Sequence, residues 1–293
     1  MVGVGALLSL TKHHGLGNDF LVLLDRDGRH PLGAGAVQAL CDRHCGVGAD
    51  GLVRGLAAEG APGDASDLVM DLRNADGYPA EMSGNGIACL AQAAVDAGLV
   101  GPDMVVASLA GPRAVSVRPG RDAGESAVSV RMGVVEVGEA GAWAPDDGGP
   151  PVSFEGVRVA VGNPHLVLWC EDPATLASLD VAGLGPRYQA RFPGGLNVEW
   201  VAPAAGPPDD GPERLIMRVF ERGAGETLAC GTGSVAAAAA VLTGARQGKA
   251  AGPVLVSNPG GDLVVDVSGP EAVLTTPVRR VARVEVDEAW LRP

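Results

Sequence analysis

Residues 221–240 read ERGAGETLACGTGSVAAAAA and predict a helix whose first turn follows a cysteine. Alanine is the strongest helix former, and the glycines beside Cys230 let a ligand approach the backbone closely. The first turn of a helix has free N–H groups and the positive end of the helix dipole. We therefore expect Cys230 to have a lowered thiol pKa and to act as a base. We expect the N–H groups to bind a carboxylate.

A second copy of this pattern lies 147 residues earlier, where residues 81–95 read EMSGNGIACLAQAAV. Ser83 stands at the position of Cys230, and each is followed by Gly-x-Gly. Asn74 precedes Ser83 by nine residues, just as Glu221 precedes Cys230. A Gly-Asn pair occurs at residues 17–18 and again at residues 162–163. Three features in one order at nearly one offset predict two duplicated halves.

Composition narrows the function classes. The 293 residues suffice for two domains with real cores, and a hydrophobic content of 46% excludes wholesale disorder. The net charge of −13 argues against a nucleic-acid partner, which needs a basic face. Five cysteines without a secretory pattern predict a reduced, cytoplasmic setting. The apolar residues 1–10 are too few to span a membrane, so we expect a first strand there and no membrane partner.

Hydrophobic patterning predicts many strands with one long helix near the centre of each half. Helices are expected at about 36–45, 86–97 and after Cys230. Strands are expected at 5–11, 21–24, 52–53, 67–73, 104–106, 114–117, 127–132, 157–161, 166–170, 196–201, 215–220, 254–256, 262–267, 272–275 and 278–286. Residues 118–125, 138–151 and 202–213 are rich in Gly, Pro and Asp and are expected to be loops.

Two groups of possible metal ligands are not favoured as metal sites. His13 and His14 are adjacent on an extended segment, so their side chains point to opposite faces, and structural roles are favoured. Cys41, His44 and Cys45 lack the further ligands that a four-coordinate zinc site needs, which favours a packed helix end. Residues 46–51, GVGADG, contain only a lone GxG, which is weak support for a nucleotide site.

The chain resembles the diaminopimelate epimerase family of cofactor-independent amino-acid racemases nearly from end to end. The resemblance rests on HGLGNDF at 14–20, GVGADG at 46–51, NADG at 74–77, SGNG at 83–86, GNPH at 162–165, NVEWV at 197–201, ERGAGET at 221–227 and CGTG at 230–233. It implies an α/β fold of two pseudo-symmetric domains, each a mostly antiparallel β-sheet wrapped around a central helix. The active site is then expected in the interdomain cleft, and the protein is expected to form a homodimer. The first domain would comprise residues 1–125 with about 277–293, and the second residues 126–276.

The same resemblance implies a reaction and a set of residues. Family members invert an amino-acid α-carbon, LL- to meso-diaminopimelate in the pathway to lysine and peptidoglycan, using two thiols on opposite faces of the substrate and no metal or pyridoxal phosphate. The catalytic positions would be Cys230, Ser83, Glu221 and His165. The amino-acid substrate would be held by Asn18, Asn74, Gly84, Asn85, Asn163, Asn197, Glu221, Arg222, Gly231 and Thr232.

Three residues around the first half-site depart from the family pattern. Ser83 replaces the first catalytic cysteine, Tyr78 follows NADG where a small residue is usual, and Ala88 replaces a typical arginine. A serine hydroxyl is far less acidic than a thiol, and Cys89 lies too far along the helix to substitute for one. Three interpretations stay open: an epimerase with a one-sided proton relay, a paralogue that epimerises or eliminates from another amino acid, and a non-catalytic amino-acid-binding protein.

Overall fold

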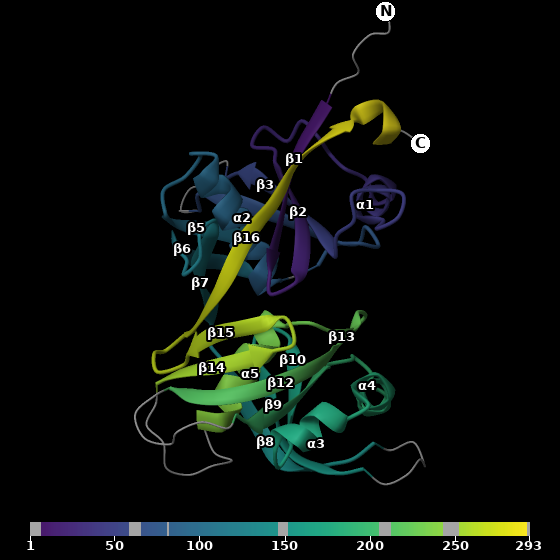
Figure 1. Cartoon of the computed structure of the whole chain (residues 1–293), viewed down its shortest axis with the longest axis vertical. Coiled ribbons are helices and arrows are strands. Elements are labelled where there is room, and N and C mark those ends of the chain that lie inside the picture. The colour runs from purple at the N-terminus through teal and green to yellow at the C-terminus, as the bar shows by residue number, and fades with distance from the viewer. Residues whose placement is uncertain are drawn as a thin grey trace, which may run out of the picture. The chain divides into compact units, whose positions relative to one another are not determined.

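The computed structural model describes residues 7–58, 66–80, 82–145, 152–204, 212–242 and 252–291. Contacts within the chain divide it into unit 1, Met1–Val130 with Thr276–Pro293, and unit 2, Arg131–Thr275 (Figure 1). The chain passes between the units within two strands, β7 (Glu125–Gly133) and β16 (Ala272–Asp287). Among the described residues, no helix is long and apolar enough to span a membrane.

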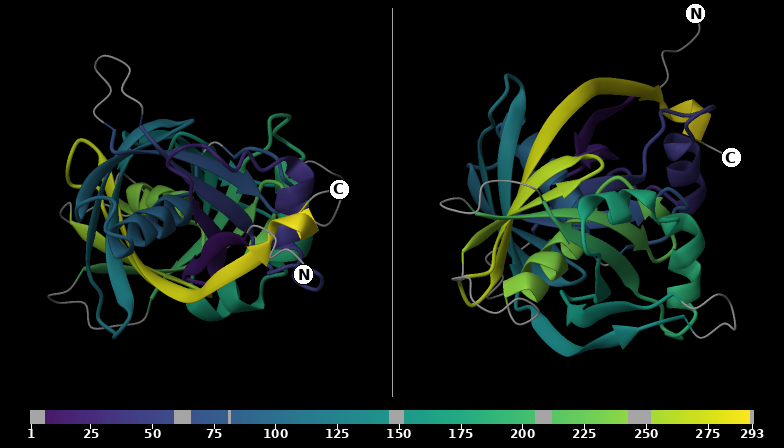
Figure 2. Two further views of the ribbon diagram at one scale, coloured as in Figure 1. Left: turned by 90° about the horizontal axis from the view of Figure 1, so that it is seen from above. Right: turned by 60° about the horizontal axis from the view of Figure 1, so that its bottom comes forward.

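Unit 1 is a curved sheet around one helix, α2 (Gly84–Asp96). Its other strands are β1 (Leu7–Gly15), β2 (Asn18–Leu24), β3 (Gly51–Ala57), β4 (Leu68–Asn74), β5 (Asp103–Ser108) and β6 (Gly111–Pro119). Neighbouring strands pair antiparallel except for β2–β3 and β4–β5, which are parallel. The central helix packs against β1 to β6, and Figure 2 shows the strands curving around it. A short 3₁₀ helix, η2 (Glu288–Leu291), ends the described chain.

Unit 2 repeats this arrangement around α5 (Gly231–Ala240). Its strands are β8 (Glu136–Trp143), β9 (Phe154–Ala160), β10 (Pro164–Trp169), β11 (Asn197–Pro203), β12 (Glu213–Glu221), β13 (Gly225–Thr227), β14 (Pro253–Asn258) and β15 (Gly261–Asp266). The parallel pairs are β10–β11 and β12–β14, at the positions of β2–β3 and β4–β5. The central helix again packs against six strands, β9 to β12, β14 and β15. Two pseudo-symmetric α/β domains with mostly antiparallel sheets are thereby confirmed.

An outer helical layer covers the other face of each sheet. In unit 1 this layer is α1 (Ala34–Cys41), and in unit 2 it is α3 (Pro173–Ser178) with α4 (Val181–Gln189). The strands between the two layers are buried on both faces, which explains the uninterrupted apolar run of β2. Along β11, Trp200 packs with the outer helices, so the alternation of side chains turns Asn197 and Glu199 toward α5.

Several expectations about elements were wrong. The segment 138–151 was expected to be a loop, but its first part belongs to β8, an exposed edge strand held by backbone pairing to β9. The helices α3 and α4 were not expected at all. Strands expected separately at 272–275 and 278–286 form one strand, β16. Pro277 lies between the residues of β16 that pair with β15 and those that pair with β1. The expected strand residues 5–6 and the loop residues 146–151 and 205–211 lie outside the described residues.

Candidate active site

Cys230 is the N-cap of α5. Its backbone is extended, and its sulfur accepts a hydrogen bond from the N–H of Gly233 at 3.4 Å. A Cβ at position 233 would lie 2.6 Å from Oε1 of Glu199, so a larger residue there would have to displace this buried carboxylate. The thiol is therefore held at the positive end of a fully buried helix, and the backbone at Gly231 and Thr232 forms the first turn.

The expected lowering of the Cys230 pKa was wrong. Burial raises the pKa of the thiol well above its ordinary value, and the carboxylates of Glu221 and Glu199 raise it further. The hydrogen bonds from Thr232 and Gly233 act in the opposite direction but are outweighed. Burial disfavours the charged thiolate, and here this effect on the pKa exceeds the opposite effect of the helix N-terminus. Cys230 therefore needs a neighbouring base to take its proton.

Glu221 is placed to be that base. It ends β12, accepts a hydrogen bond from the hydroxyl of Thr227, and interacts with the Cys230 thiol. Burial raises the pKa of Glu221, while its contacts with Thr227 and Cys230 lower it. A carboxylate whose pKa is raised binds a proton more readily at neutral pH, so Glu221 suits proton exchange with the thiol.

A chain of side-chain contacts leads from the sheet to the sulfur. His165 is fully buried, with Nδ1 2.7 Å from Oε1 of Glu199 and Nε2 2.9 Å from Oδ1 of Asn163. Asn163 donates to the hydroxyl of Thr232 at 3.4 Å, and that hydroxyl lies 3.5 Å from the sulfur of Cys230. Glu199 was not predicted as a site residue, although its place in NVEWV, two positions after Asn197, puts both on the α5 face of β11.

Two further predicted residues of unit 2 lie beside this chain. Asn197 begins β11, and its Oδ1 accepts from the backbone N–H of Arg222 at 2.9 Å. The guanidinium of Arg222 is exposed and donates to the carbonyl of Gly194 at 3.1 Å. Asn197 thus fixes the turn after β12, and Arg222 presents a cation at the surface of the unit.

Ser83 occupies the same place in unit 1. It is the N-cap of α2 with an extended backbone, and its Oγ accepts from the N–H of Gly86 at 3.0 Å. The first turn that follows consists of Gly84 and Asn85. The alignment of Ser83 with Cys230 therefore holds in the backbone, the capping bond and the helix that follows.

The asparagines predicted for unit 1 surround this helix end only in part. Asn85 is buried and donates to Oδ1 of Asn18 at 3.3 Å, so these two lie together. Asn74 ends β4 as Glu221 ends β12, but it is exposed and serves the turn to Tyr78 through its backbone. A role for its side chain stays a prediction. The expected cleft between the domains also stays a prediction.

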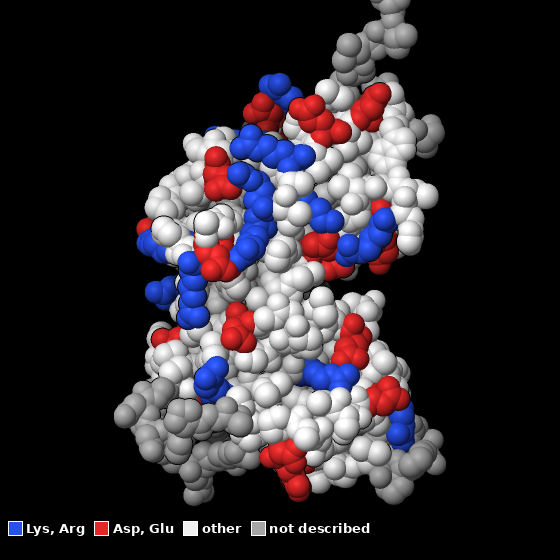
Figure 3. Space-filling view, in the orientation of Figure 1, with Lys and Arg blue, Asp and Glu red and all other residues white. Residues whose placement is uncertain are grey.

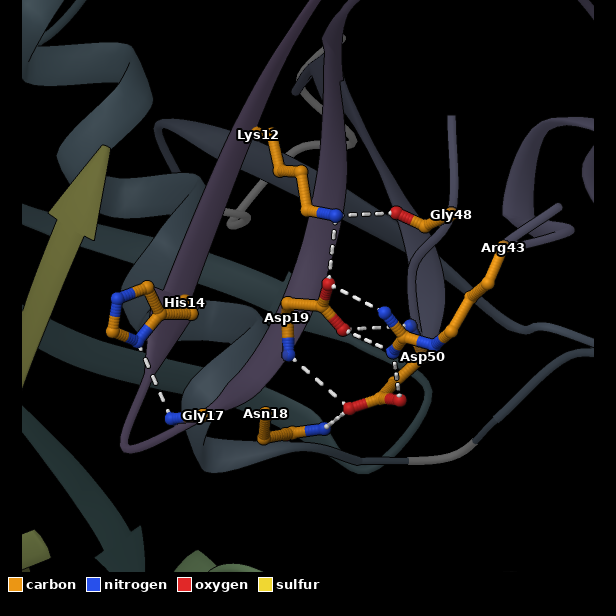
Figure 4. Close-up of polar contacts among 8 residues, drawn as sticks. All are labelled: Lys12, His14, Gly17, Asn18, Asp19, Arg43, Gly48 and Asp50. Carbon is orange, nitrogen blue, oxygen red and sulfur yellow. Dashed lines mark hydrogen bonds and ion pairs between the residues drawn. The ribbon is translucent and has the colours of Figure 1, made fainter. Parts of the chain in front are cut away.

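Figure 4 shows the charged cluster that supports Asn18. Asp50 accepts from the amide of Asn18 at 2.9 Å and from Arg43 at 2.7 Å. Asp19 accepts from Arg43 and from Lys12. Burial works to raise the pKa of Asp19, but its contacts with Arg43 and Lys12 bring it below its ordinary value. Asp50 was not predicted as a site residue, although it lies in the GVGADG motif, because its contact with Asn18 joins residues 32 positions apart.

Of the other histidines and cysteines singled out from the sequence, His13, Cys41 and Cys89 are buried, whereas His44 and Cys45 are exposed beyond the end of α1, so the packed helix end expected there holds only for Cys41. His13 is buried between Gln92 and Thr11, and burial lowers its pKa. Cys41 is buried at the end of α1, and Cys89 is buried in the interior of α2. All five cysteines are free thiols. On the face shown in Figure 3, acidic and basic side chains lie interspersed over unit 1.

Comparison with known proteins gives one consistent result. The family model described as diaminopimelate epimerase matches residues 10–137 and 157–281. The diaminopimelate epimerase of Mycobacterium avium is 43% identical, covering 97% of this chain and 98% of that protein. The diaminopimelate epimerase of Rhodococcus erythropolis is 42% identical with the same coverage.

Solved structures share the fold at low identity. A phenazine biosynthesis protein of the PhzF family from Bacillus anthracis has a TM-score of 0.72 and 15% identity, covering 96% of this chain and 99% of that one. A hydroxyproline epimerase from Agrobacterium vitis, with bound trans-4-hydroxy-L-proline, has a TM-score of 0.65 and 16% identity, covering 96% of this chain and 93% of that one.

Proposed function

Because the chain belongs to the diaminopimelate epimerase family, we propose that it is an isomerase that inverts an amino-acid α-carbon, converting LL- to meso-diaminopimelate without pyridoxal phosphate. The observation that carries this proposal is Cys230, a thiol at a helix N-terminus with a carboxylate, Glu221, in contact with it. The motifs on which the resemblance rests lie on matching elements of the two units, as expected for a duplicated chain of this family.

The proposed reaction begins with the thiol. Glu221 takes the proton of Cys230, and the resulting thiolate removes the α-proton of the substrate. The N–H groups at Gly231 and Thr232, with those at Gly84 and Asn85, hold the α-carboxylate and stabilise the charge that develops on it. Asn18, Asn74, Asn163, Asn197 and Arg222 hold the rest of the amino acid, and His165 assists at Cys230, to which it is linked through Asn163 and Thr232.

The second proton-transfer position distinguishes two versions of this function. Ser83 keeps the position of a thiol but not its acidity, because a hydroxyl donates a hydrogen bond readily and is a poor base. It favours a one-sided relay in which removal of the α-proton by Cys230 is faster than the reverse step from the other face. The same feature supports a second candidate, removal of the α-proton followed by loss of a β-substituent from a different amino acid.

Exchange of the α-proton with solvent tests the proposal. In heavy water, LL-diaminopimelate should lose its α-proton signal in the proton NMR spectrum in the presence of the wild-type protein. Cys230→Ala should lower the exchange rate by about 10²–10⁴-fold, because it removes the base. Cys45→Ala, which changes an exposed thiol, is the control and should exchange normally. If Cys230→Ala exchanges at the wild-type rate, the proposed mechanism is wrong.

Product analysis separates the alternatives. Formation of meso-diaminopimelate identifies the epimerase, and release of ammonia from a β-substituted amino acid identifies elimination. Binding without any α-proton exchange identifies an amino-acid-binding protein. We also propose that the protein is a homodimer, as is usual in the family, and that it is cytoplasmic, which fits its five free thiols. Light scattering on the purified protein in solution measures the oligomeric state.

A further inference from the structure

Asp50 lies in the loop before β3 and accepts hydrogen bonds from three directions. Its Oδ2 accepts from the side-chain amide of Asn18 at 2.9 Å and from the backbone N–H of Asp19 at 3.2 Å. Its Oδ1 accepts from Arg43 at 2.7 Å (Figure 4). An ionised carboxylate has only acceptor sites, so every group that contacts it must present a donor.

This requirement fixes the direction of a chain of amides. Because Asn18 must turn its NH₂ toward Asp50, its Oδ1 faces the other way and accepts from Nδ2 of Asn85 at 3.3 Å. The Oδ1 of Asn85 then accepts from the hydroxyl of Thr276 at 3.5 Å. One carboxylate therefore sets the orientation of two amides, and each amide uses one of its two N–H groups within the chain.

The chain reaches the N-terminus of α2. Asn85 is buried in the first turn of that helix, two residues after Ser83. Its amide packs against Gly15, where a Cβ would lie 2.8 Å from Oδ1 of Asn85. A larger residue at position 15 would displace the amide, so the backbone of β1 is shaped to admit it.

The negative charge of Asp50 is offset locally. Arg43 contacts both Asp50 and Asp19, and Lys12 contacts Asp19 at 2.9 Å. Two cations thus balance two carboxylates. Asp50 can order Asn18 without placing a net negative charge near a group that would bind an anion.

We propose that Asp50 is a positioning residue that acts through Asn18 on Asn85, so that amide N–H groups face a substrate carboxylate at the N-terminus of α2. This assignment rests on the proposed function, since it names what orders the carboxylate-binding end of unit 1.

Asp50→Asn tests the assignment with little change in shape. An amide at position 50 both donates and accepts, so Asn18 loses its single orientation. A hydrogen bond to a charged group is stronger than one between neutral groups, but the partial exposure of Asp50 weakens it. We therefore expect KM for α-proton exchange to rise about tenfold in Asp50→Asn. The kcat and its pH profile should change less than twofold, because they depend on Cys230. Asp103→Asn, which removes an exposed partner of Arg118, is the matched control and should leave KM unchanged.

A double-mutant cycle shows whether the effect passes through Asn18. In an Asn18→Ala background, Asp50→Asn should change KM less than twofold, because the amide that it orders is gone. A full tenfold change in that background overturns the assignment, and so does an unchanged KM in the single variant.

A binding measurement keeps this test independent of turnover. Calorimetric titration with LL-diaminopimelate in a Cys230→Ala background gives Kd without chemistry. A Kd about tenfold weaker with Asp50→Asn supports the assignment even if the wild-type protein fails the exchange assay. Equal Kd values for the two proteins overturn it, whatever the outcome for Cys230.

Discussion

The N-terminus of α2 and the N-terminus of α5 have the same backbone conformation, but their N-cap side chains differ in acidity. Ser83 and Cys230 are both extended N-caps, and each accepts a hydrogen bond from the N–H three residues later. The strand pairings make His165 equivalent to Phe20, Glu199 to Val53, and Glu221 to Asn74. Every titratable group of this set belongs to unit 2. The repeat thus preserves a scaffold, and the two copies differ at a few strand positions that carry ionisable side chains in unit 2 alone.

The hydrogen-bond chains differ in direction as well. In unit 1 the chain of amides donates toward Asp50, a carboxylate at the edge of the unit. In unit 2 the equivalent asparagine, Asn163, lies between His165 and Thr232, and the chain ends on the sulfur of Cys230. One asparagine position therefore contacts the second residue after the N-cap in both copies, in a chain that ends on a carboxylate in unit 1 and on a thiol in unit 2.

The largest effect is expected from making the two helix ends alike. Ser83→Cys should raise α-proton exchange of the slower-exchanging stereoisomer of diaminopimelate by about 10²–10⁴-fold, the usual contribution of a general acid or base. The fold should be retained, because a cysteine already caps α5 in this way. Deuterium uptake by each stereoisomer, followed by NMR, measures the change. If both stereoisomers exchange equally in the wild type, Ser83 is not the weaker half of a pair.

A smaller effect is expected from giving unit 2 the residues of unit 1. Glu199→Val leaves buried His165 without its carboxylate and should destabilise the protein by about 3 kcal/mol. The double variant His165→Phe with Glu199→Val should recover most of this loss, since Phe20 and Val53 pack in the equivalent places in unit 1. The urea midpoint followed by circular dichroism measures both. A double variant less stable than the single one would show that the pair is not interchangeable.

The smallest effect concerns alkaline pH. Burial raises the pKa of Cys230, so the folded protein keeps the thiol proton at a pH where the unfolded chain has lost it. The stability due to this thiol is complete below about pH 8.5 and falls as pH rises above it. Cys230→Ser should flatten the decline in melting temperature between about pH 8.5 and 10. An equal decline in both proteins would assign it to other groups, such as the buried Cys89.

Much of the scaffold was predictable because its signals are local or repeated. The two glycine-rich helix starts and the constant offset between the halves predicted the central helices and the duplication. The strand β8 gave no signal because most of its side chains are exposed and it is held mainly by backbone pairing to β9. The raised pKa of Cys230 was missed because desolvation depends on strands far away in sequence. Glu199 and Asp50 were missed because their roles come from contacts with residues 34 and 32 positions away.

The course of β16 has a consequence for synthesis on the ribosome. Unit 1 contains both ends of the chain, and β1 pairs with the last part of β16 from His14 opposite Arg279 to Leu7 opposite Asp287. Unit 2 is one continuous segment that can fold as it leaves the exit tunnel. Unit 1 cannot complete its sheet until β16 has been synthesised. Until then β1 has an unpaired edge of the kind that promotes aggregation. A nonsense codon just after residue 275 would therefore leave the first-made part of the protein unfinished and the later-made part complete.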